Sequence, residues 1–463
     1  MYQLYYQPDG VWVGDIMPYG KDGSFYVYHQ RDTRNPGPFG EPFGWALATT
    51  KDFVTYKDYG ESLKRGTDEE ADQFIYAGSV FEAQGCFHAF YTGYNREFLK
   101  AGKTSQTLLH ATSQDGINWE KSKEALEIPP QSGYDRRNWR DPFVLWDEER
   151  QEYLWILGAR KGEDKRKQTG RLVSFTSKNL EKWKFQGDFW SPGIFTMFEM
   201  PEIFKMGDWW YLVFSEYSDG NKIHYRMSKS LYGPWIAPKD DSFDGRAYYA
   251  GRTAFDGKRR VLFGWVPTRD GDDDKNSYLW GGTFVPHEVF QREDGTLGVK
   301  PLDSVMEAFS GWKDLFNPCM KTIDIKQESV LCEEAGVLTA LETYLTFEEG
   351  TREISIKFYE DLETGVSYEY RFYVEENRIV FNKCPNYPWY QCFNIGLERP
   401  IALNAGEEYH IQLIVDNDIA TLYVNGTALN VRLCDRPGNA LSITVMNGAI
   451  KTRGTKISTE INQ

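Results

Sequence analysis

Three carboxylates stand at matching distances ahead of three aromatic-rich segments. The pairs are Asp15 ten residues before Phe25, Asp141 twelve before Tyr153, and Glu199 ten before Trp209. Each acid lies within three residues of a proline in an otherwise apolar stretch, where a solvated surface charge would be unusual. Acids crowded into one partly dry site raise the pKa of at least one of them, which keeps a general acid protonated near neutral pH. The pattern predicts hydrolytic chemistry carried by carboxylates. Unrelated turn or ion-pair acids are the alternative.

Composition excludes several other kinds of chemistry and partner. With six histidines, no H-E-x-x-H and no C-x-x-C motif, we expect neither a metal nor another cofactor. The net charge of −15 argues against binding to nucleic acid or to an anionic membrane surface. The sequence contains no run of 18 apolar residues, so we expect no membrane span. The N-terminus lacks a basic and apolar leader, so we expect a cytoplasmic protein. The sequence leaves the oligomeric state open.

A repeat in the first three hundred residues would position the three acids. Strand-length aromatic segments recur five times, each opened by a turn: 23–30, 85–93, 151–159, 208–217 and 258–266. Between them a Ser/Thr pair, a polar turn and an aromatic residue return: 48–58, 111–121, 175–185 and 227–235. Five strand-rich units at this spacing predict a five-bladed β-propeller over residues 1–309. Innermost-strand residues of a propeller face one central funnel, so the three acids should converge. An irregular β-sandwich is the alternative.

The repeat stops after residue 309. Residues 310–335 are predicted to form a linker and a first edge strand. The segments 352–360, 368–376 and 410–426 alternate apolar and polar residues with period two, which predicts a C-terminal β-sandwich over residues 336–463. The expected fold class is therefore all-β, a five-bladed propeller followed by a sandwich.

The order of the motifs resembles glycoside hydrolase family 32, the family of invertases, inulinases and levanases. Its WMNDPNG, FSGS, RDP and ECPD motifs are similar to WVGDIMP (12–18), YAGSV (76–80), Arg140-Asp141-Pro142 and Glu199-Met200-Pro201-Glu202. The similarity continues through DGRAYYAGRTAF (244–255) and GGTFVPHEV (281–289). The matches run in order through the whole predicted propeller, and the predicted sandwich follows as it does in the family.

The resemblance implies a retaining hydrolase of β-D-fructofuranosides, with a carbohydrate as its partner and no cofactor. Asp15 would be the nucleophile, Glu199 the general acid/base, and Asp141 the residue that holds sugar hydroxyls. The implied substrate-binding residues are Arg140, Trp45, Ser79, Gln30 and Tyr249. For Trp45, a place in the core of a blade is an equally good interpretation.

Departures from the family pattern, which include Ile16-Met17 in place of Pro-Asn, leave open a substrate other than sucrose or plain inulin. Gly14 replaces the Asn before the nucleophile, while Met200 and Glu202 replace Cys and Asp in the acid motif. Three alternatives stay open: an inverting hydrolase like the five-bladed arabinanases and xylosidases, a fructosyl transferase, and a non-catalytic sugar-binding propeller. If Glu199 only held the sugar, Glu202 would be the nearest other acid.

Overall fold

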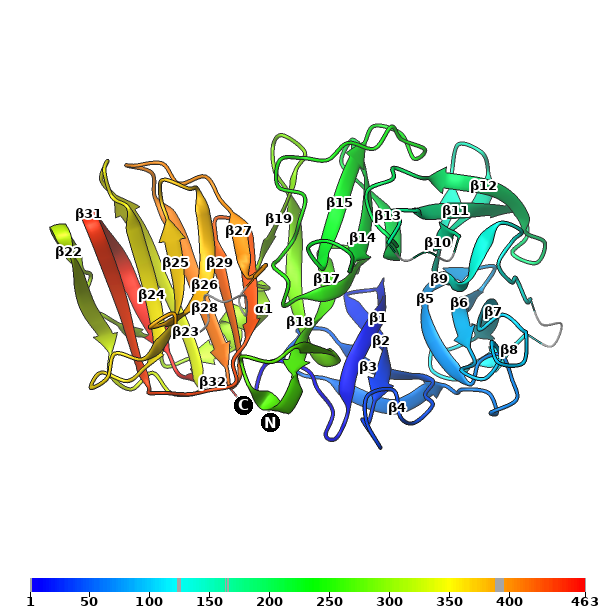
Figure 1. The fold of residues 1–463 in the computed structure, drawn as a ribbon, viewed down its shortest axis with the longest axis horizontal. Helices are drawn as coiled ribbons and strands as arrows, with labels where there is room; N and C mark the ends of the chain where they lie inside the picture. The colour runs from blue at the N-terminus through cyan, green and yellow to red at the C-terminus, as the bar shows by residue number, and fades with distance from the viewer. Residues whose placement is uncertain (1, 123–125, 163, 165, 388–394, 463) are drawn as a thin grey trace.

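The computed structural model describes residues 2–122, 126–162, 164, 166–387 and 395–462. Its regular structure is almost entirely β-strand, which confirms the all-β class. The described helical segments are the single-turn helix α1 (Asp303–Ala308) and the 3-10 turn η1 (Asp270–Asp272). No helix of this part of the chain is long and apolar enough to cross a membrane. Figure 1 shows two parts side by side, with β1–β19 in one and β22–β31 in the other.

Consecutive strands of the N-terminal part pair antiparallel in the runs β1–β4, β5–β8, β9–β12, β13–β15 and β16–β19, here called units, and the first and last runs join into one eight-stranded sheet. Each aromatic segment of the sequence repeat forms the second strand of its unit, at β2, β6, β10, β14 and β17. The strands are β1 (Trp12–Lys21), β2 (Ser24–Asp32), β3 (Trp45–Thr50), β4 (Lys57–Leu63), β5 (Phe74–Ala83), β6 (Cys86–Tyr94), β7 (Gln106–Ser113), β8 (Glu120–Lys121), β9 (Tyr134–Asp147), β10 (Glu152–Lys161), β11 (Gly170–Ser177), β12 (Lys184–Trp190), β13 (Glu199–Met206), β14 (Trp209–Glu216), β15 (Lys222–Ser228), β16 (Tyr249–Phe255), β17 (Arg260–Arg269), β18 (Tyr278–Gln291) and β19 (Leu297–Lys300).

The turn after the third strand explains the Ser/Thr pattern between the aromatic segments. In three units a hydroxyl at the end of that strand accepts a hydrogen bond from the backbone N–H three residues later, as in an ST turn. The pairs are Thr50 with Phe53, Ser113 with Gly116, and Ser177 with Leu180, at 2.8–3.0 Å. The first and last units are also joined, because β1 pairs with β18 at Val13↔Gly282.

The C-terminal part contains one sheet of eleven strands, β21–β31, and a separate pair formed by β20 and β32. The long strand β31 pairs with β24 along its first half and with β23 along its second half, so it connects two stretches of sheet around a shared apolar core. The strands are β20 (Phe309–Ser310), β21 (Lys313–Asp314), β22 (Cys319–Cys332), β23 (Leu338–Phe347), β24 (Glu353–Glu360), β25 (Ser367–Tyr373), β26 (Arg378–Cys384), β27 (Glu398–Pro400), β28 (Tyr409–Asp416), β29 (Ile419–Val424), β30 (Thr427–Arg432), β31 (Ala440–Ser458) and β32 (Glu460–Ile461).

A continuous core joins the two parts. Tyr248 and Phe284 of the N-terminal part belong to the same buried cluster as Ile414 and Ala428 of the C-terminal part. The last strand, β32, pairs with β20 next to the junction, and Figure 1 shows both chain termini near this boundary. The C-terminal part therefore packs as a support for the last N-terminal unit.

Candidate active site

The first strand of every N-terminal unit changes register at the same point. Two consecutive residues are skipped in the pairing with the second strand: Gly14-Asp15, Tyr76-Ala77, Asp141-Pro142, Met200-Pro201 and Ala250-Gly251. Three of these skipped residues have a left-handed backbone conformation although they are not glycine: φ is 62° at Asp141, 51° at Met200 and 56° at Ala250. Such bulges redirect side chains and are common beside active sites. Here residues in or beside four of these bulges, Asp15, Tyr76, Asp141 and Glu199, line one cavity.

One cavity of about 380 Å³ opens at these bulges. Asp15 from β1, Asp141 from β9 and Glu199 from β13 all line it, together with Arg140 and Gln30. The three predicted acids therefore line one chamber. Its size suits one or two sugar rings.

The Glu199 carboxylate is held from two sides. Arg140 donates to Oε1 from Nη2 at 2.6 Å and from Nε at 3.3 Å, and the Tyr249 hydroxyl donates to Oε2 at 2.6 Å. Burial lowers the pKa of Arg140, but the charges of Glu199 and Asp141 outweigh it and raise that pKa overall. Arg140 is therefore a permanent cation in the cavity.

The Asp141 carboxylate connects two neighbouring units. Its Oδ2 accepts from the Met200 backbone N–H at 3.0 Å, while its own N–H donates to Thr92 Oγ1 at 3.0 Å. The buried Arg252 donates to the Asp141 carbonyl at 2.9 Å and to the Gly78 carbonyl. Burial raises the pKa of Asp141, and the Arg140 charge opposes that rise. Asp141 is consequently fixed in orientation.

Asp15 lies partly buried in the cavity, and its Oδ1 accepts from the Trp265 indole N–H at 3.3 Å. Burial raises the pKa of Asp15 well above its ordinary value, and the negative charges of Asp141 and Glu199 add to the rise. The Trp265 hydrogen bond and Arg140 act in the opposite direction. Burial and the neighbouring acids therefore favour the protonated form of Asp15 more than water would.

The other predicted residues divide into two groups. Gln30 lines the cavity and Tyr249 contacts Glu199. Trp45 is fully buried in an apolar cluster with its indole N–H on the Tyr76 carbonyl at 3.0 Å, and Ser79 accepts from the Val144 N–H at 3.3 Å. The structure places neither Trp45 nor Ser79 among the residues that line the cavity.

Glu202, the nearest other acid in the sequence, serves the fold. Its carboxylate accepts from the Thr253 N–H at 2.5 Å and from the Thr253 hydroxyl at 2.6 Å, and Arg260 lies 3.6 Å away. The side chain is buried and does not line the catalytic cavity.

Several cavity residues have no counterpart in the sequence prediction. Tyr76, Tyr94, Arg137, Asn138 and Trp280 line the wall. Tyr76 carries a signal that could have marked it, because it lies at the start of YAGSV, in step with Asp15 and Glu199. Trp280 comes from β18, far along the chain from β1, and only the closure of the first and last units brings it in.

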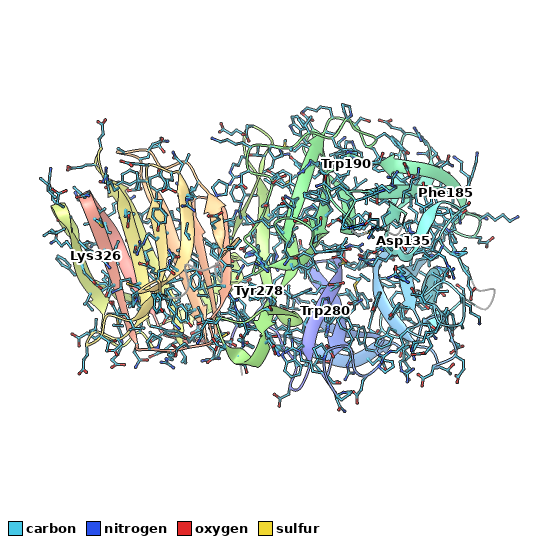
Figure 2. The ribbon with its side chains drawn as sticks, in the orientation of Figure 1. Asp135, Phe185, Trp190, Tyr278, Trp280 and Lys326 are labelled. Carbon is cyan, nitrogen blue, oxygen red and sulfur yellow. The ribbon has the colours of Figure 1, made fainter. Side chains whose placement is uncertain are left out.

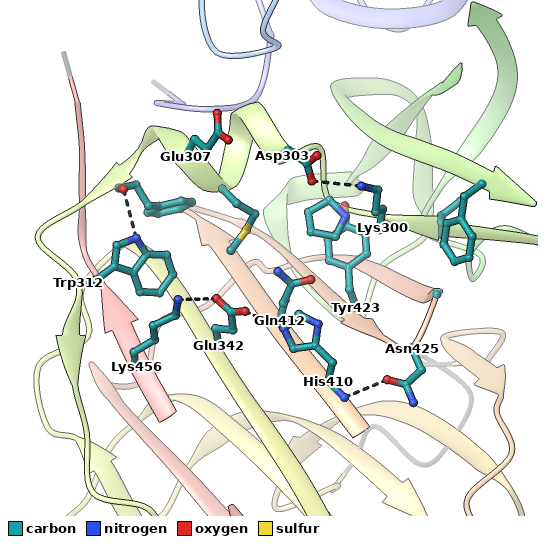
Figure 3. A pocket seen from close by; sticks show the side chains of 16 residues that line it. Lys300, Asp303, Glu307, Trp312, Glu342, His410, Gln412, Tyr423, Asn425 and Lys456 are labelled. Atoms are coloured by element: carbon teal, nitrogen blue, oxygen red, sulfur yellow. Dashed lines mark hydrogen bonds and ion pairs between the residues drawn. The ribbon is translucent and has the colours of Figure 1, made fainter. Parts of the chain in front are cut away.

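A larger cavity, of about 680 Å³, lies where α1 meets the C-terminal sheet (Figure 3). Its acids are mostly engaged in ion pairs, since Glu342 contacts Lys456 at 2.9 Å and His410 at 2.7 Å, and Asp303 contacts Lys300 at 3.1 Å. The crowded acids that hydrolysis needs lie instead in the cavity of Asp15, Asp141 and Glu199. Within the described residues, no His, Cys, Asp and Glu side chains form a group suited to holding a metal ion.

Three acids and an arginine around one sugar-sized cavity of an all-β chain are the features of a glycoside hydrolase. The model of the glycosyl hydrolases family 32 N-terminal domain matches residues 5–301. The chain belongs to this family, as its motifs predicted.

Relatives extend the similarity along the chain. The chain is 26% identical over 403 residues to a raffinose invertase of Escherichia coli, and the match covers 80% of this chain and 79% of the relative. It is 29% identical over 275 residues to a sucrose-6-phosphate hydrolase of Bacillus subtilis, covering 54% and 53%. The solved sucrose-6-phosphate hydrolase of Lactobacillus gasseri has a TM-score of 0.78 at 18% identity, covering 100% of this chain and 93% of that one. This last likeness concerns the fold.

Proposed function

We propose that the protein hydrolyses β-D-fructofuranosides with net retention of configuration. The observation that carries the proposal is the convergence of Asp15, Asp141 and Glu199 on one cavity in a chain of glycoside hydrolase family 32. In this proposal the five antiparallel units are five blades of a propeller over residues 1–309, followed by a sandwich over residues 336–463. The equivalent bulges on five first strands support the five-bladed arrangement, because equivalent positions of blades surround one axis.

In the proposed cycle Asp15 attacks the anomeric carbon while Glu199 protonates the departing glycosidic oxygen. The C–O bond to the leaving group breaks as a fructosyl ester with Asp15 forms. Glu199, now ionised, takes a proton from water, which attacks the same carbon and frees Asp15. Asp141, fixed by Met200, accepts hydrogen bonds from sugar hydroxyls. Two displacements at one carbon give retention.

The proposed cycle needs an ionised Asp15, whereas the surroundings of Asp15 favour its protonated form. Burial and neighbouring charge favour the protonated form of Asp15, and the Arg140 guanidinium lies 2.6 Å from the Glu199 carboxylate. In the proposed cycle Asp15 must therefore lose its proton before it attacks. An exchange of roles, with Asp15 as the acid and Glu199 as the nucleophile, is the competing assignment that an experiment has to separate.

Azide rescue separates the two assignments. Azide needs no general base, so it should restore turnover to Glu199→Gln and give a fructosyl azide of retained configuration. If Asp15 is the nucleophile, azide should take its place in the Asp15→Gly variant. A single attack by azide then gives a fructosyl azide of inverted configuration. The Glu199→Gln deficit should be on the order of 10²–10⁴-fold on sucrose and much smaller on an aryl fructoside with an activated leaving group. A retained azide product from the Asp15 variant would reverse the roles.

Product analysis of the wild-type protein tests the stereochemistry and the acceptor. NMR of the first-formed anomer distinguishes a retaining hydrolase from an inverting one. Release of free fructose, compared with longer oligosaccharides at rising substrate concentration, distinguishes hydrolysis from fructosyl transfer. A wild-type protein that binds sugars but cleaves no fructoside would contradict the proposal as a whole.

One further observation favours a phosphorylated fructoside as a second candidate substrate. Arg137 lines both the catalytic cavity and a neighbouring cavity of about 610 Å³. Only its backbone N–H has a hydrogen-bond partner, the Asp135 carboxylate, and its guanidinium makes no hydrogen bond or ion pair with another described residue. An uncompensated arginine suits a phosphate dianion, and the Bacillus subtilis relative is a sucrose-6-phosphate hydrolase.

The phosphate hypothesis predicts a selective loss. Arg137→Ala should lower kcat/KM for sucrose 6-phosphate by roughly 10- to 100-fold, as expected for a charge-assisted hydrogen bond, and leave sucrose hydrolysis nearly unchanged. Arg136→Ala is the control, because Arg136 is an exposed neighbour that bonds the Gly102 carbonyl instead. Equal effects on both substrates would exclude this candidate.

A further inference from the structure

The residue before the proposed nucleophile has no room for a side chain. A Cβ atom built on Gly14 would lie 2.0 Å from Cη2 and 2.3 Å from Cζ2 of Trp280, far inside van der Waals contact. Trp280 belongs to β18, which pairs with β1 at Val13↔Gly282. Figure 2 labels Trp280 in the N-terminal part of the molecule. The indole therefore occupies the volume that a side chain at position 14 would fill.

Packing fixes the indole in this place. Its ring centroid lies 4.5 Å from that of Phe39 and 6.3 Å from that of Phe43, with the second pair nearly parallel. It also meets Trp265 edge-on at 5.8 Å, and Trp265 is the donor to Asp15. Arg34 binds the Trp280 carbonyl at 3.2 Å. Trp280 nevertheless remains partly exposed, and it lines the same cavity as Asp15.

The consequence concerns the wall of the sugar site. Most residues that line this chamber have polar side chains, but next to Gly14 the lining residue Trp280 presents ring carbons. Gly14 contributes no side-chain donor or acceptor, whereas the family motif has an Asn at this position. A hydroxyl facing this wall would lose its partner, while a C–H face of a sugar would gain aromatic contact.

We infer that Trp280 is a specificity-determining residue, which replaces the side chain of residue 14 as the wall of the sugar subsite. It selects fructosides that present an apolar ring face beside Asp15. This inference rests on the proposed function. A site without a hydrogen-bonding group at this point should discriminate weakly between a fructoside and its deoxy analogue there, whereas a polar wall would discriminate strongly.

A cycle of three variants tests the pairing of the two residues. Gly14→Asn alone should lose thermal stability and activity, because its Cβ meets the indole. Trp280→Ala should raise KM for fructosides by roughly 10-fold or more, with a smaller effect on kcat, because uniform binding is lost. The double variant should regain stability relative to Gly14→Asn and should shift the ratio of kcat/KM between fructosides. Trp146→Ala, a half-exposed tryptophan of β9 outside the cavity, is the control.

The outcomes keep the two proposals apart. If the wild-type protein cleaves no fructoside, the proposed function fails, and the thermal-stability cycle still reports whether Gly14 and Trp280 compete for one volume. If the wild-type protein is active but Trp280→Ala leaves KM and the substrate ratio unchanged, the specificity role is overturned. Additive losses in the double variant would overturn the steric pairing.

Discussion

Ionisation of the Asp15 carboxyl lowers the stability of the folded state. Burial and the two neighbouring acids raise its pKa, so the folded protein prefers the protonated form more than the unfolded chain does. A carboxyl with a raised folded-state pKa contributes its full stability below the unfolded pKa, about 3.9 for Asp. That contribution is lost as the pH rises through the folded-state pKa. At neutral pH the ionised Asp15 therefore opposes folding.

Asp15→Asn should consequently be inactive and more stable. We expect kcat to fall by about 10⁴-fold or more, as for other groups that act in concert in a site, while Tm at neutral pH rises above that of the wild-type protein. The difference in Tm should shrink as the pH is lowered, because the wild-type carboxyl becomes protonated. Calorimetry over a pH series measures it, with the exposed turn variant Asp208→Asn as control. A less stable Asp15→Asn at every pH would contradict this account.

Asp141 should set the pH at which activity begins. Its negative charge contributes to the raised pKa of Asp15, and a nucleophile must be ionised to attack. Removing that charge in Asp141→Asn lowers the pKa of Asp15, so the acid limb of the kcat/KM profile should move to lower pH. Overall activity should fall by roughly 10²-fold or more, since a positioned hydrogen-bonding group is lost. An acid limb that stays in place or moves upward would show that Asp141 does not act on Asp15.

At the scale of elements, the sequence predicts the strands well and the bulges poorly. Aromatic segments and Ser/Thr turns are local patterns, so β2, β6, β10, β14 and β17 fall where the repeat predicts them. A bulge is defined by the register of the partner strand, which no local pattern encodes. The equivalent positions of the acids in the repeat were therefore enough to predict that they share one chamber. The contact of Arg140 with Glu199 and the position of Trp280 could not be predicted in this way.

Arg252 holds three of the bulges together. Its guanidinium, 2% exposed, donates to carbonyls of Gly78 in β5 and of Asp141 in β9 from its own place in β16. Burial lowers the pKa of Arg252 to about 10, and Asp141 opposes the shift. Because a planar fork reaches several acceptors at once and an ammonium group does not, lysine is a poor replacement here.

Arg252→Lys should lower kcat by more than the loss of folded protein explains. We expect an unfolding free energy lower by about 3 kcal/mol, the scale for buried acceptors that lose their donors, and a roughly 10-fold or greater loss of kcat per folded molecule because Asp141 shifts. Arg226→Lys is the matched control, since Arg226 is also buried but pairs with Asp241, away from the bulges. Denaturant titration with active-site counting separates the two quantities. Equal kcat per folded molecule in both variants would mean that Arg252 only stabilises the fold.

On the scale of the whole molecule, a buried polar network crosses the boundary between the two parts. Asp244 accepts from Asn430 twice, from the backbone N–H at 2.8 Å and from Nδ2 at 2.6 Å. His287 lies 2.9 Å from Asn430 Nδ2 through Nε2 and 2.8 Å from the Tyr423 hydroxyl through Nδ1. All four side chains are at most 3% exposed. Buried polar groups of this kind are costly to leave unpaired.

The network predicts that the two parts unfold together. Asn430→Ala removes the side-chain donor to Asp244 and a neighbour of His287 but keeps the backbone donor, so the free energy of unfolding should fall by about 3 kcal/mol, the upper end of the scale for buried polar groups that lose a partner. Because the apolar core is continuous across the boundary, calorimetry should show one transition at lower Tm, and kcat at 25 °C should hardly change. Asn439→Ala is the control, since the Asn439 amide bonds the exposed Glu334 in the same C-terminal part. Two separate transitions in the wild-type protein would show that the C-terminal part folds independently of the site that it adjoins.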